Sequence, residues 1–298
     1  MYQGIMTFKS EIMIPVVSKN ELSIIFNRLL LDNPILFYVP SYSYCIEVNK
    51  GVIIRPNYQY DKNITLNYIM NVSQFLSKFD VLKQMNELEK EIHVHDYCQN
   101  RIKYDYSFNK HSHSVIGCIV HNSAVCEGIA KFVKIIFDYL GLKSLVVTGR
   151  LDNPDTRKME SHAWNIIEIH GHFYHLDVTL DVTMSNMQKR FDYFNLTDED
   201  IKKDHTIEND VPPCMETKHN YFTSQALVMN NIYELEQFIL HSVKRGKKNI
   251  HFKMSEKHEN QIILEIAKRV YSSTTYNSFQ VGIKGNEAQS VYEINFIH

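Results

Sequence analysis

The sequence lacks the features typical of a membrane or nucleic-acid-binding protein. Its 298 residues contain no run of about 18 apolar residues, the length that a helix needs to cross a bilayer. The opening residues, MYQGIMTFKSEIMIPVVSK, have no basic segment followed by an apolar one, so no signal peptide is expected. The formal net charge is −2 and like charges form no block. We therefore expect no membrane partner and no nucleic-acid partner.

Cysteine is also scarce, and the sequence has no metal-binding motif. The five cysteines are Cys45, Cys98, Cys118, Cys126 and Cys214. Their odd number and wide spacing predict reduced thiols and a cytoplasmic location. Neither Cys-x-x-Cys nor HExxH occurs. The 15 histidines include the run HGHFYH, but alternation along a strand would point its last two histidines to opposite faces. We therefore expect no metal and no cofactor.

What the chain does contain is the composition of a globular protein with a substantial core. Hydrophobic residues make up 44% of it and charged residues 22%. Residues 64–101 hold neither glycine nor proline, which favours long helices. Other patterns predict a helix at 21–31, strands at 35–39, 42–48, 52–55 and 142–150, an extended run at 115–120 and an exposed loop at 151–160. After residue 224 they predict the order βαβαββ.

The stretch that begins at Cys126 has the pattern of a buried helix. Its apolar residues recur at intervals of three and four and end at a glycine that suits a left-handed cap: Ile129, Phe132, Val133, Ile136, Tyr139, Leu140 and Gly141. Asn122 or Ser123 is the expected N-cap, which places Cys126 in or near the first turn. Unpaired N–H groups and the positive helix end there favour the nucleophilic thiolate. Gly128 would let a substrate backbone approach closely. A free cysteine on such a helix is also a common core residue.

The segments SHAWNIIEI and HFYHLDVT, joined by His170 and Gly171, predict a β-hairpin. With a two-residue turn, Ile169 faces His172, and His162 and Asp177 become diagonal neighbours on one face. A carboxylate in that position can accept the imidazole N–H and favour the imidazolium. Each residue alone has an ordinary structural explanation, but together with Cys126 they satisfy the pattern of nucleophilic catalysis by cysteine.

AVCEGIAKFVKIIFDYLGLKSLVVTGR followed by SHAWNIIEIHGHFYHLDVT resembles the core of the transglutaminase-like superfamily. The resemblance extends over roughly residues 86–205, since EIHVHDYCQNRIKYDYS and YFNLTDEDIKKDHT are similar to flanking segments of bacterial members. It implies a papain-like α+β core, in which a nucleophile helix packs on an antiparallel sheet. It also implies a nucleophile at Cys126, a base at His162 and an orienting carboxylate at Asp177.

Three parts are expected, with VPPC at 211–214 as the second boundary: an N-terminal α/β flanking region at 1–85, a transglutaminase-like catalytic domain at 86–212 and a small α+β domain at 213–298. The expected function is acyl transfer or hydrolysis on a peptide or carboxamide substrate, through a thioester on Cys126. Water as the acceptor gives a protease or amidase, and an amine gives a transglutaminase. The alternative is an inactive binding or scaffold protein with the same fold.

Further site residues are predicted around this group. The backbone N–H of Cys126 is the expected first donor to an oxyanion, and Tyr104 or Asn122 is a candidate for the second. Trp164 is a candidate substrate contact. Cys118 is the alternative nucleophile, but it precedes the helix and lacks the helix-terminal environment that favours Cys126.

Overall fold

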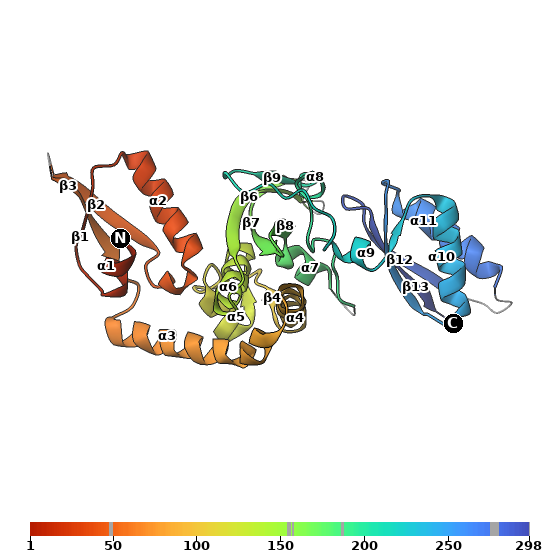
Figure 1. The fold of residues 1–298 in the computed structure, drawn as a ribbon, viewed down its shortest axis with the longest axis horizontal. Helices are drawn as coiled ribbons and strands as arrows, with labels where there is room; N and C mark the ends of the chain where they lie inside the picture. The colour runs from red at the N-terminus through yellow and green to blue at the C-terminus, as the bar shows by residue number, and fades with distance from the viewer. Residues whose placement is uncertain (48–49, 154–155, 157, 186–187, 275–279, 298) are drawn as a thin grey trace.

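The computed structural model describes residues 1–47, 50–153, 156, 158–185, 188–274 and 280–297. Three groups of elements follow one another along the long axis of the molecule (Figure 1). Helices and largely antiparallel sheets share the chain, which confirms the predicted α+β class. The predicted boundaries after residues 85 and 212 stay predictions.

The N-terminal group is a three-stranded antiparallel sheet, in the order β1-β3-β2, that packs against a helix. Its elements are α1 (Tyr2–Met6), β1 (Ile12–Ile14), α2 (Lys19–Asp32), the 3₁₀ helix η1 (Pro34–Leu36), β2 (Ser41–Glu47) and β3 (Gly51–Asn57). A capping box between Ser18 and Glu21 starts α2, where a helix was predicted. The predicted strand at 35–39 is wrong, because Pro34 has the φ of a helical first position and starts η1. Residue 48 of the predicted strand 42–48 lies outside the described residues.

Three helical segments connect this group to the next one: α3 (Lys62–Leu76), η2 (Ser77–Gln84) and α4 (Glu87–Arg101). Asp61 and Asn86 cap α3 and α4 with their side chains. The helical prediction for 64–101 is confirmed, although its middle part is a 3₁₀ helix. The end of α3 joins the core of the central group, where the rings of Phe75 and Phe132 lie 5.5 Å apart.

The central group is built around α6 (Cys126–Tyr139), which packs on a four-stranded antiparallel sheet in the order β8-β7-β6-β9. The strands are β6 (Ser144–Asn153), β7 (Lys158–Ile169), β8 (His172–Leu176) and β9 (His205–Ile207). The smaller elements are β4 (Lys103–Tyr104), α5 (Val115–His121), β5 (Ser123–Ala124), α7 (Val178–Met184) and α8 (Asp198–Ile201). The predicted apolar stripe of α6 is buried except for Tyr139, which is partly exposed, and Gly141 has the predicted left-handed φ, at 77°.

Two predictions for the residues just before α6 are wrong. The run at 115–120 forms α5 instead of extended chain, because a short apolar run has no period that separates a buried helix from a strand. Asn122 ends α5 with a left-handed φ of 52°, and β5 follows it. The N-cap of α6 is consequently Val125, and neither Asn122 nor Ser123 takes that place.

The hairpin of β7 and β8 has the predicted register, with Ile169 opposite His172. Its two turn residues, His170 and Gly171, both have positive φ. β8 ends at Leu176, so Asp177 starts α7 instead of continuing the strand. The predicted exposed loop at 151–160 is wrong for most of its length, because β6 and β7 stay paired out to Asn153 and Lys158. Residues 154–155 and 157 lie outside the described part of the chain.

The C-terminal group contains α9 (Tyr221–Ser224), β10 (Val228–Met229), α10 (Ile232–Lys244), β11 (Asn249–Met254), α11 (Asn260–Ser272), β12 (Gln280–Asn286) and β13 (Val291–Ile297). From β10 onward the predicted order βαβαββ is confirmed, and the strands lie in the order β10-β11-β13-β12. Helices α10 and α11 pack on this sheet through a separate apolar core (Figure 1).

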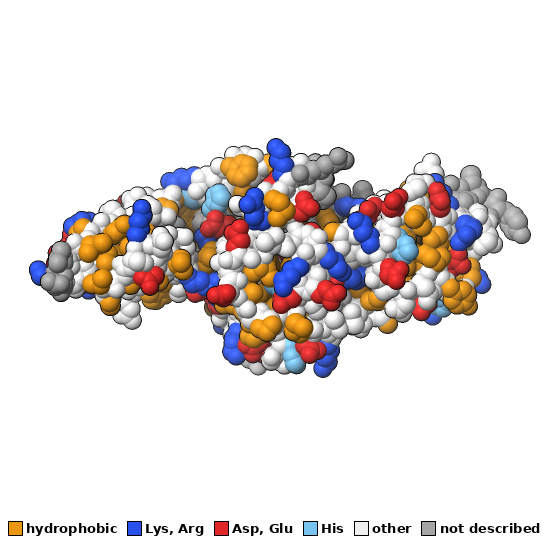
Figure 2. Space-filling view, turned by 90° about the horizontal axis from the view of Figure 1, so that it is seen from above, with side chains coloured by type: hydrophobic (Ala, Val, Ile, Leu, Met, Phe, Trp, Pro, Cys, Tyr) orange, Lys and Arg blue, Asp and Glu red, His pale blue; other side chains and the backbone are white. Residues whose placement is uncertain are grey.

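Acidic and basic side chains are interspersed on the face in Figure 2, and hydrophobic side chains are visible on all three groups, the N-terminal one included. Exposed apolar side chains in that part of the chain include Met13, Val16, Ile24, Ile25 and Ile46. Among the described residues, none of the helices has both the length and the apolar character needed to pass through a bilayer.

Candidate active site

Cys126 is the first residue of α6 and its side chain is partly exposed. The N-cap, Val125, has no side-chain oxygen and makes no side-chain hydrogen bond to the first turn. The first-turn N–H groups of α6 are therefore not capped by a side chain, in contrast to those of α2, α3 and α4. The positive end of the helix, next to the sulfur, can stabilise a thiolate or an oxyanion.

His162 reaches this position from β7, where it pairs with Gly149 of the neighbouring strand. Its Nε2 lies 2.6 Å from Oδ2 of Asp177, and both side chains are buried. Asp177 is fixed as the N-cap of α7, because its Oδ1 accepts the N–H of Leu180 at 3.1 Å. With Nε2 engaged by the carboxylate, Nδ1 is the ring nitrogen left for the thiol of Cys126. The structure thus brings the three predicted residues together.

The surroundings of His162 favour its imidazolium form. Burial by itself would lower the pKa of the imidazole, but the charge and hydrogen bond of Asp177 and the adjacent Cys126 thiol raise it to about 10. For Asp177, burial acts to raise the pKa, and His162 and His205 outweigh it and hold the pKa well below its usual range. At neutral pH the pair is therefore an imidazolium and a carboxylate.

His205 belongs to this cluster, although the sequence pattern did not single it out. Its Nε2 lies 3.2 Å from the Asp177 oxygen that also contacts His162. The strand that carries it, β9, is three residues long and joins the sheet beside β6. Nothing in the segment KKDHT distinguishes this histidine from the other 14 in the sequence. Only the strand pairing places it next to Asp177.

The other predicted site residues lie in different positions. Tyr104 is half-buried near the thiol; burial and the charge of Cys126 are the two largest causes that raise the pKa of its phenol to about 12. Asn122 is exposed at the end of α5, where its carbonyl accepts the N–H of Lys103 at 2.9 Å. Trp164 is fully buried and stacks on His162 with ring centroids 6.1 Å apart. Trp164 therefore supports the imidazole from behind and is not exposed to a substrate.

Gly128 has a different role from the predicted one. A Cβ at this position would lie 2.2 Å from the carbonyl oxygen of Ser112 and 2.8 Å from Cβ of Ala124. The backbone that approaches the glycine is therefore that of the chain's own loop before α5, and not that of a substrate.

Two clusters among the described residues have a donor set and spacing that a metal ion could use: His162, Asp177 and His205, and His175, Asp198 and Cys214. In the second cluster the Trp164 indole donates to His175 Nδ1 at 3.0 Å, which leaves Nε2–H to donate to Asp198 at 2.8 Å. Burial lowers the pKa of His175 to about 4, so this ring is neutral. Hydrogen bonds engage the histidine and aspartate atoms of both clusters, and Cys214 Sγ donates to the carbonyl oxygen of Pro212 at 3.7 Å.

A family model described as the Transglutaminase-like superfamily matches residues 57–178. This segment includes Cys126, His162 and Asp177. Residues 57–178 belong to the transglutaminase-like superfamily.

Several solved structures are similar to this chain. One is a TGase, at 15% identity and a TM-score of 0.33, covering 60% of this chain and 53% of the other. A candidate cysteine protease from Cytophaga hutchinsonii has 13% identity and a TM-score of 0.31, and the match covers 60% of this chain and 80% of that protein. Menin, crystallised to reveal the binding site for Mixed Lineage Leukemia protein, has 12% identity and a TM-score of 0.29, covering 73% and 49%.

This chain spans about half the length of the TGase. A search of curated proteins finds no match.

Proposed function

We propose that the transglutaminase-like core is a cysteine enzyme that transfers or hydrolyses acyl groups of peptide or carboxamide substrates. The observation that carries this proposal is the 2.6 Å contact between His162 and Asp177 beside a partly exposed thiol at the start of α6. A thiol, an imidazole and a carboxylate in this order make a nucleophile, its acid–base partner and the group that orients the partner.

The first half of the reaction forms a thioester. The Cys126 thiolate attacks the carbonyl carbon, and the resulting oxyanion lies within reach of the first-turn N–H groups of α6. The bond between carbon and nitrogen then breaks, and His162 gives its Nδ1 proton to the departing amine. Asp177 keeps the ring oriented throughout, because it is held by the start of α7.

The second half of the reaction releases the acyl group. Water or a primary amine attacks the thioester carbonyl and gives a proton to His162. The carbon–sulfur bond then breaks, and Cys126 and His162 return as a thiolate and an imidazolium. Water gives a protease, amidase or deamidase, and an amine gives a transglutaminase.

Two observations favour an enzyme over an inactive scaffold protein. Cys126 keeps part of its surface exposed, whereas Cys98, Cys118 and Cys214 are buried. Burial raises the pKa of the Cys118 thiol well above its usual value, so Cys118 is not suited to replace Cys126 as the nucleophile. An inactive binding protein would have no physical need for a buried ion pair beside a partly exposed thiol.

All five cysteines are free, which supports the proposal that the protein works in a reducing compartment such as the cytoplasm. We likewise propose a peptide or protein as the substrate. The flanking groups at 1–85 and 213–298 are then appended to the catalytic domain at 86–212.

The thiol is tested by alkylation with iodoacetamide at neutral pH, followed by mass spectrometry of each cysteine peptide. Cys45 is partly exposed on β2 and serves as a reference within the same molecule. We expect Cys126 to react at least about tenfold faster than Cys45. A Cys126 rate no higher than that of Cys45 or of a model thiol would overturn the proposal.

The reaction is tested on a glutamine-containing peptide, with and without an added primary amine. Release of ammonia alone indicates hydrolysis, amine incorporation indicates transfer, and cleavage of the peptide chain indicates a protease. Cys126→Ala should abolish each of these, while Cys214→Ala, which removes a buried thiol from a His–Asp pair elsewhere in the core, should not. Equal loss in both variants would contradict the assignment of Cys126.

A further inference from the structure

A line of buried polar side chains continues from Asp177 away from the thiol. His205 lies between two carboxylates: its Nε2 is 3.2 Å from Asp177 Oδ2 and its Nδ1 is 2.6 Å from Asp204 Oδ1. His205, Asp177 and Asp204 are all buried. Because a carboxylate can only accept, both ring nitrogens of His205 must donate, and the ring is an imidazolium.

The groups around His205 are consistent with that charge. The two carboxylates face its two ring nitrogens, while the rings of His162, Trp164 and Tyr193 lie with centroids 5.4, 5.0 and 5.7 Å away. Burial opposes the charge, but the hydrogen bonds to Asp177 and Asp204 raise the pKa of His205. The cation therefore holds Asp177 through Oδ2, while the N–H of Leu180 at the start of α7 holds Oδ1.

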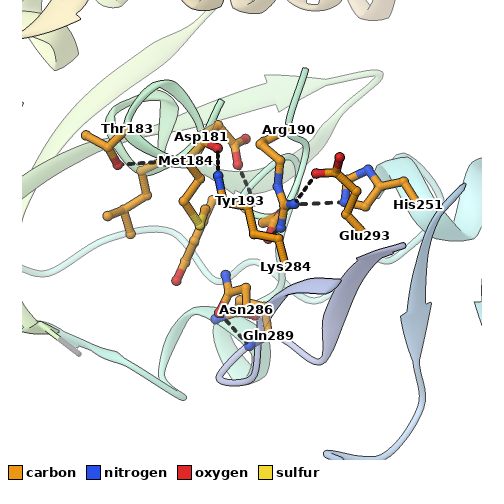
Figure 3. Close-up of polar contacts among 12 residues, drawn as sticks. Asp181, Thr183, Met184, Arg190, Tyr193, His251, Lys284, Asn286, Gln289 and Glu293 are labelled. Carbon is orange, nitrogen blue, oxygen red and sulfur yellow. Dashed lines mark hydrogen bonds and ion pairs between the residues drawn. The ribbon is translucent and has the colours of Figure 1, made fainter. Parts of the chain in front are cut away.

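Asp204 is itself fixed by two further side chains. The hydroxyl of Tyr193 donates to its Oδ2 at 2.6 Å. Gln289, which lies between β12 and β13, donates from Nε2 to both carboxylate oxygens, at 3.3 and 3.2 Å, and to the carbonyl of Asp200 at 3.1 Å. Figure 3 shows Gln289 and Asn286 beside Tyr193. Gln289 is fully buried although it comes from the C-terminal group.

We propose that His205 and Gln289 are positioning residues, through which the C-terminal group fixes Asp177 and thereby the imidazole that activates Cys126. The sequence of contacts is Gln289, Asp204, His205, Asp177 and His162. This inference rests on the proposed function. It assigns to the C-terminal group a role in reactivity, beyond its attachment to the core.

If the C-terminal group were only attached to the core, loss of any one of its polar side chains at the contact should affect Cys126 to the same extent. Lys253 is the matched control for Gln289. Lys253, on β11 of the C-terminal group, contacts the core at Asp200 Oδ1 over 3.2 Å, but it does not touch Asp204. Gln289→Met removes the hydrogen bonds of one amide nitrogen to Asp204 and to the Asp200 carbonyl, and Lys253→Met removes one ion pair with Asp200, at nearly constant volume and between the same two groups. Among the described residues Gln289 Oε1 has no hydrogen-bond partner, so the substitution removes only the contacts of its Nε2.

The test uses the full chain and two readouts that need no substrate. The first is the iodoacetamide rate of Cys126 relative to that of Cys45. The second is NMR of the histidine ring nitrogens, which detects the proton between His162 Nε2 and Asp177 Oδ2 and the two ring protons of His205. We expect Gln289→Met to slow Cys126 about threefold to tenfold and to shift the His162 proton, because small displacements of a catalytic group lower its rate.

Lys253→Met should leave both readouts within about twofold of the unmodified protein, since it changes attachment without changing Asp204. His205→Gln should slow Cys126 by about tenfold or more, because Asp177 and Asp204 both lose a charged partner and Asp204 keeps the neutral donors Tyr193 and Gln289. If His205→Gln does not fold, the comparison of Gln289→Met with Lys253→Met still tests the positioning role.

The two proposals fail in different ways. A fast Cys126 in the unmodified chain with an unchanged Gln289→Met variant overturns the positioning role and leaves the proposed function standing. Equal effects of Gln289→Met and Lys253→Met would also overturn it, as would a His205 ring with one unprotonated nitrogen at neutral pH. An unreactive Cys126 in the unmodified chain overturns the proposed function and this inference with it.

Discussion

At the scale of single residues, the charge of His162 depends on one carboxylate. Because Asp177 and Cys126 raise the pKa of His162 to about 10 against the effect of burial, the imidazolium should persist through neutral pH. We expect enzymatic activity to fall as the pH rises through about 10, where the leaving amine loses its proton donor. Asp177→Asn should move this fall in activity to lower pH and reduce activity by about 10³–10⁴-fold. A ring-nitrogen NMR titration of His162 in both proteins measures the shift directly.

The raised pKa of His162 also determines how the stability of the protein changes with pH. Folded His162 holds a proton that the unfolded chain releases near its ordinary value of 6.5. Its contribution to stability is thus fully present below pH 6.5 and is lost as the pH rises to about 10. A free energy of unfolding that rises over this range would contradict the assignment.

Glu91 is a second group whose titration should change the stability of the protein, and it lies away from the Cys126 thiol. It is fully buried on α4; burial raises its pKa to about 8, and a hydrogen bond from Asn195 Nδ2 at 2.9 Å only partly opposes this. The side chain is therefore protonated in the folded protein at neutral pH. Its contribution to stability should be complete below pH 4.5 and lost as the pH rises to about 8.

Glu91→Gln should remove that dependence while preserving the fold, since glutamine has nearly the shape of the protonated acid. Urea unfolding at several pH values between 4 and 9 measures it, with an expected difference on the order of a few kcal/mol at the alkaline end. Parallel curves for the two proteins would show that Glu91 is ionised.

At the scale of elements, Gly128 fixes how α6 meets the loop before α5. Gly128→Ala would bring Cβ to 2.2 Å from the Ser112 carbonyl oxygen, so the loop or the helix must move. We expect a loss of about 1–3 kcal/mol in the free energy of unfolding, measured by urea denaturation, and slower alkylation of Cys126. Gly282→Ala on β12 is the control, since its Cβ would meet nothing nearer than 3.9 Å. Equal stabilities would show that the loop adjusts freely.

The sequence predicted some elements well because their patterns are local. The period of α6, its final Gly141 and the two-residue turn at His170 each depend on neighbours in the chain. The helix α5 was missed because six apolar residues fit a strand equally well. The cap of α6 was missed because Asn122 is used by the preceding helix instead. His205 was missed because its position depends on strand pairing with β6.

At the scale of the whole molecule, a buried cluster of three charged side chains joins the central and C-terminal groups. Arg190 contacts Glu293 of β13 at 3.0 Å (Figure 3). It also contacts Asp192 at 2.7 Å, and all three side chains are buried. Arg190→Met would leave two carboxylates without their cation. We expect a loss of about 3–5 kcal/mol in the free energy of unfolding.

The matched control is Arg55→Met, which removes an arginine from an exposed pair with Glu11 at 2.8 Å. That pair is screened by solvent, so the variant should be close to the unmodified protein in stability. Thermal and urea unfolding of both variants give the comparison. Similar stabilities for Arg190→Met and Arg55→Met would show that the interface between the groups contributes little.

The uncapped start of α6 has a consequence for protein engineering. A serine or aspartate at the N-cap stabilises a helix by about 1 kcal/mol. Val125 makes no side-chain cap hydrogen bond, so α6 lacks this contribution. Screens that select only for thermal resistance should therefore favour polar replacements at position 125. Such replacements would occupy the same N–H groups that a reacting carbonyl oxygen would need, so a more robust variant obtained this way would be expected to turn over more slowly.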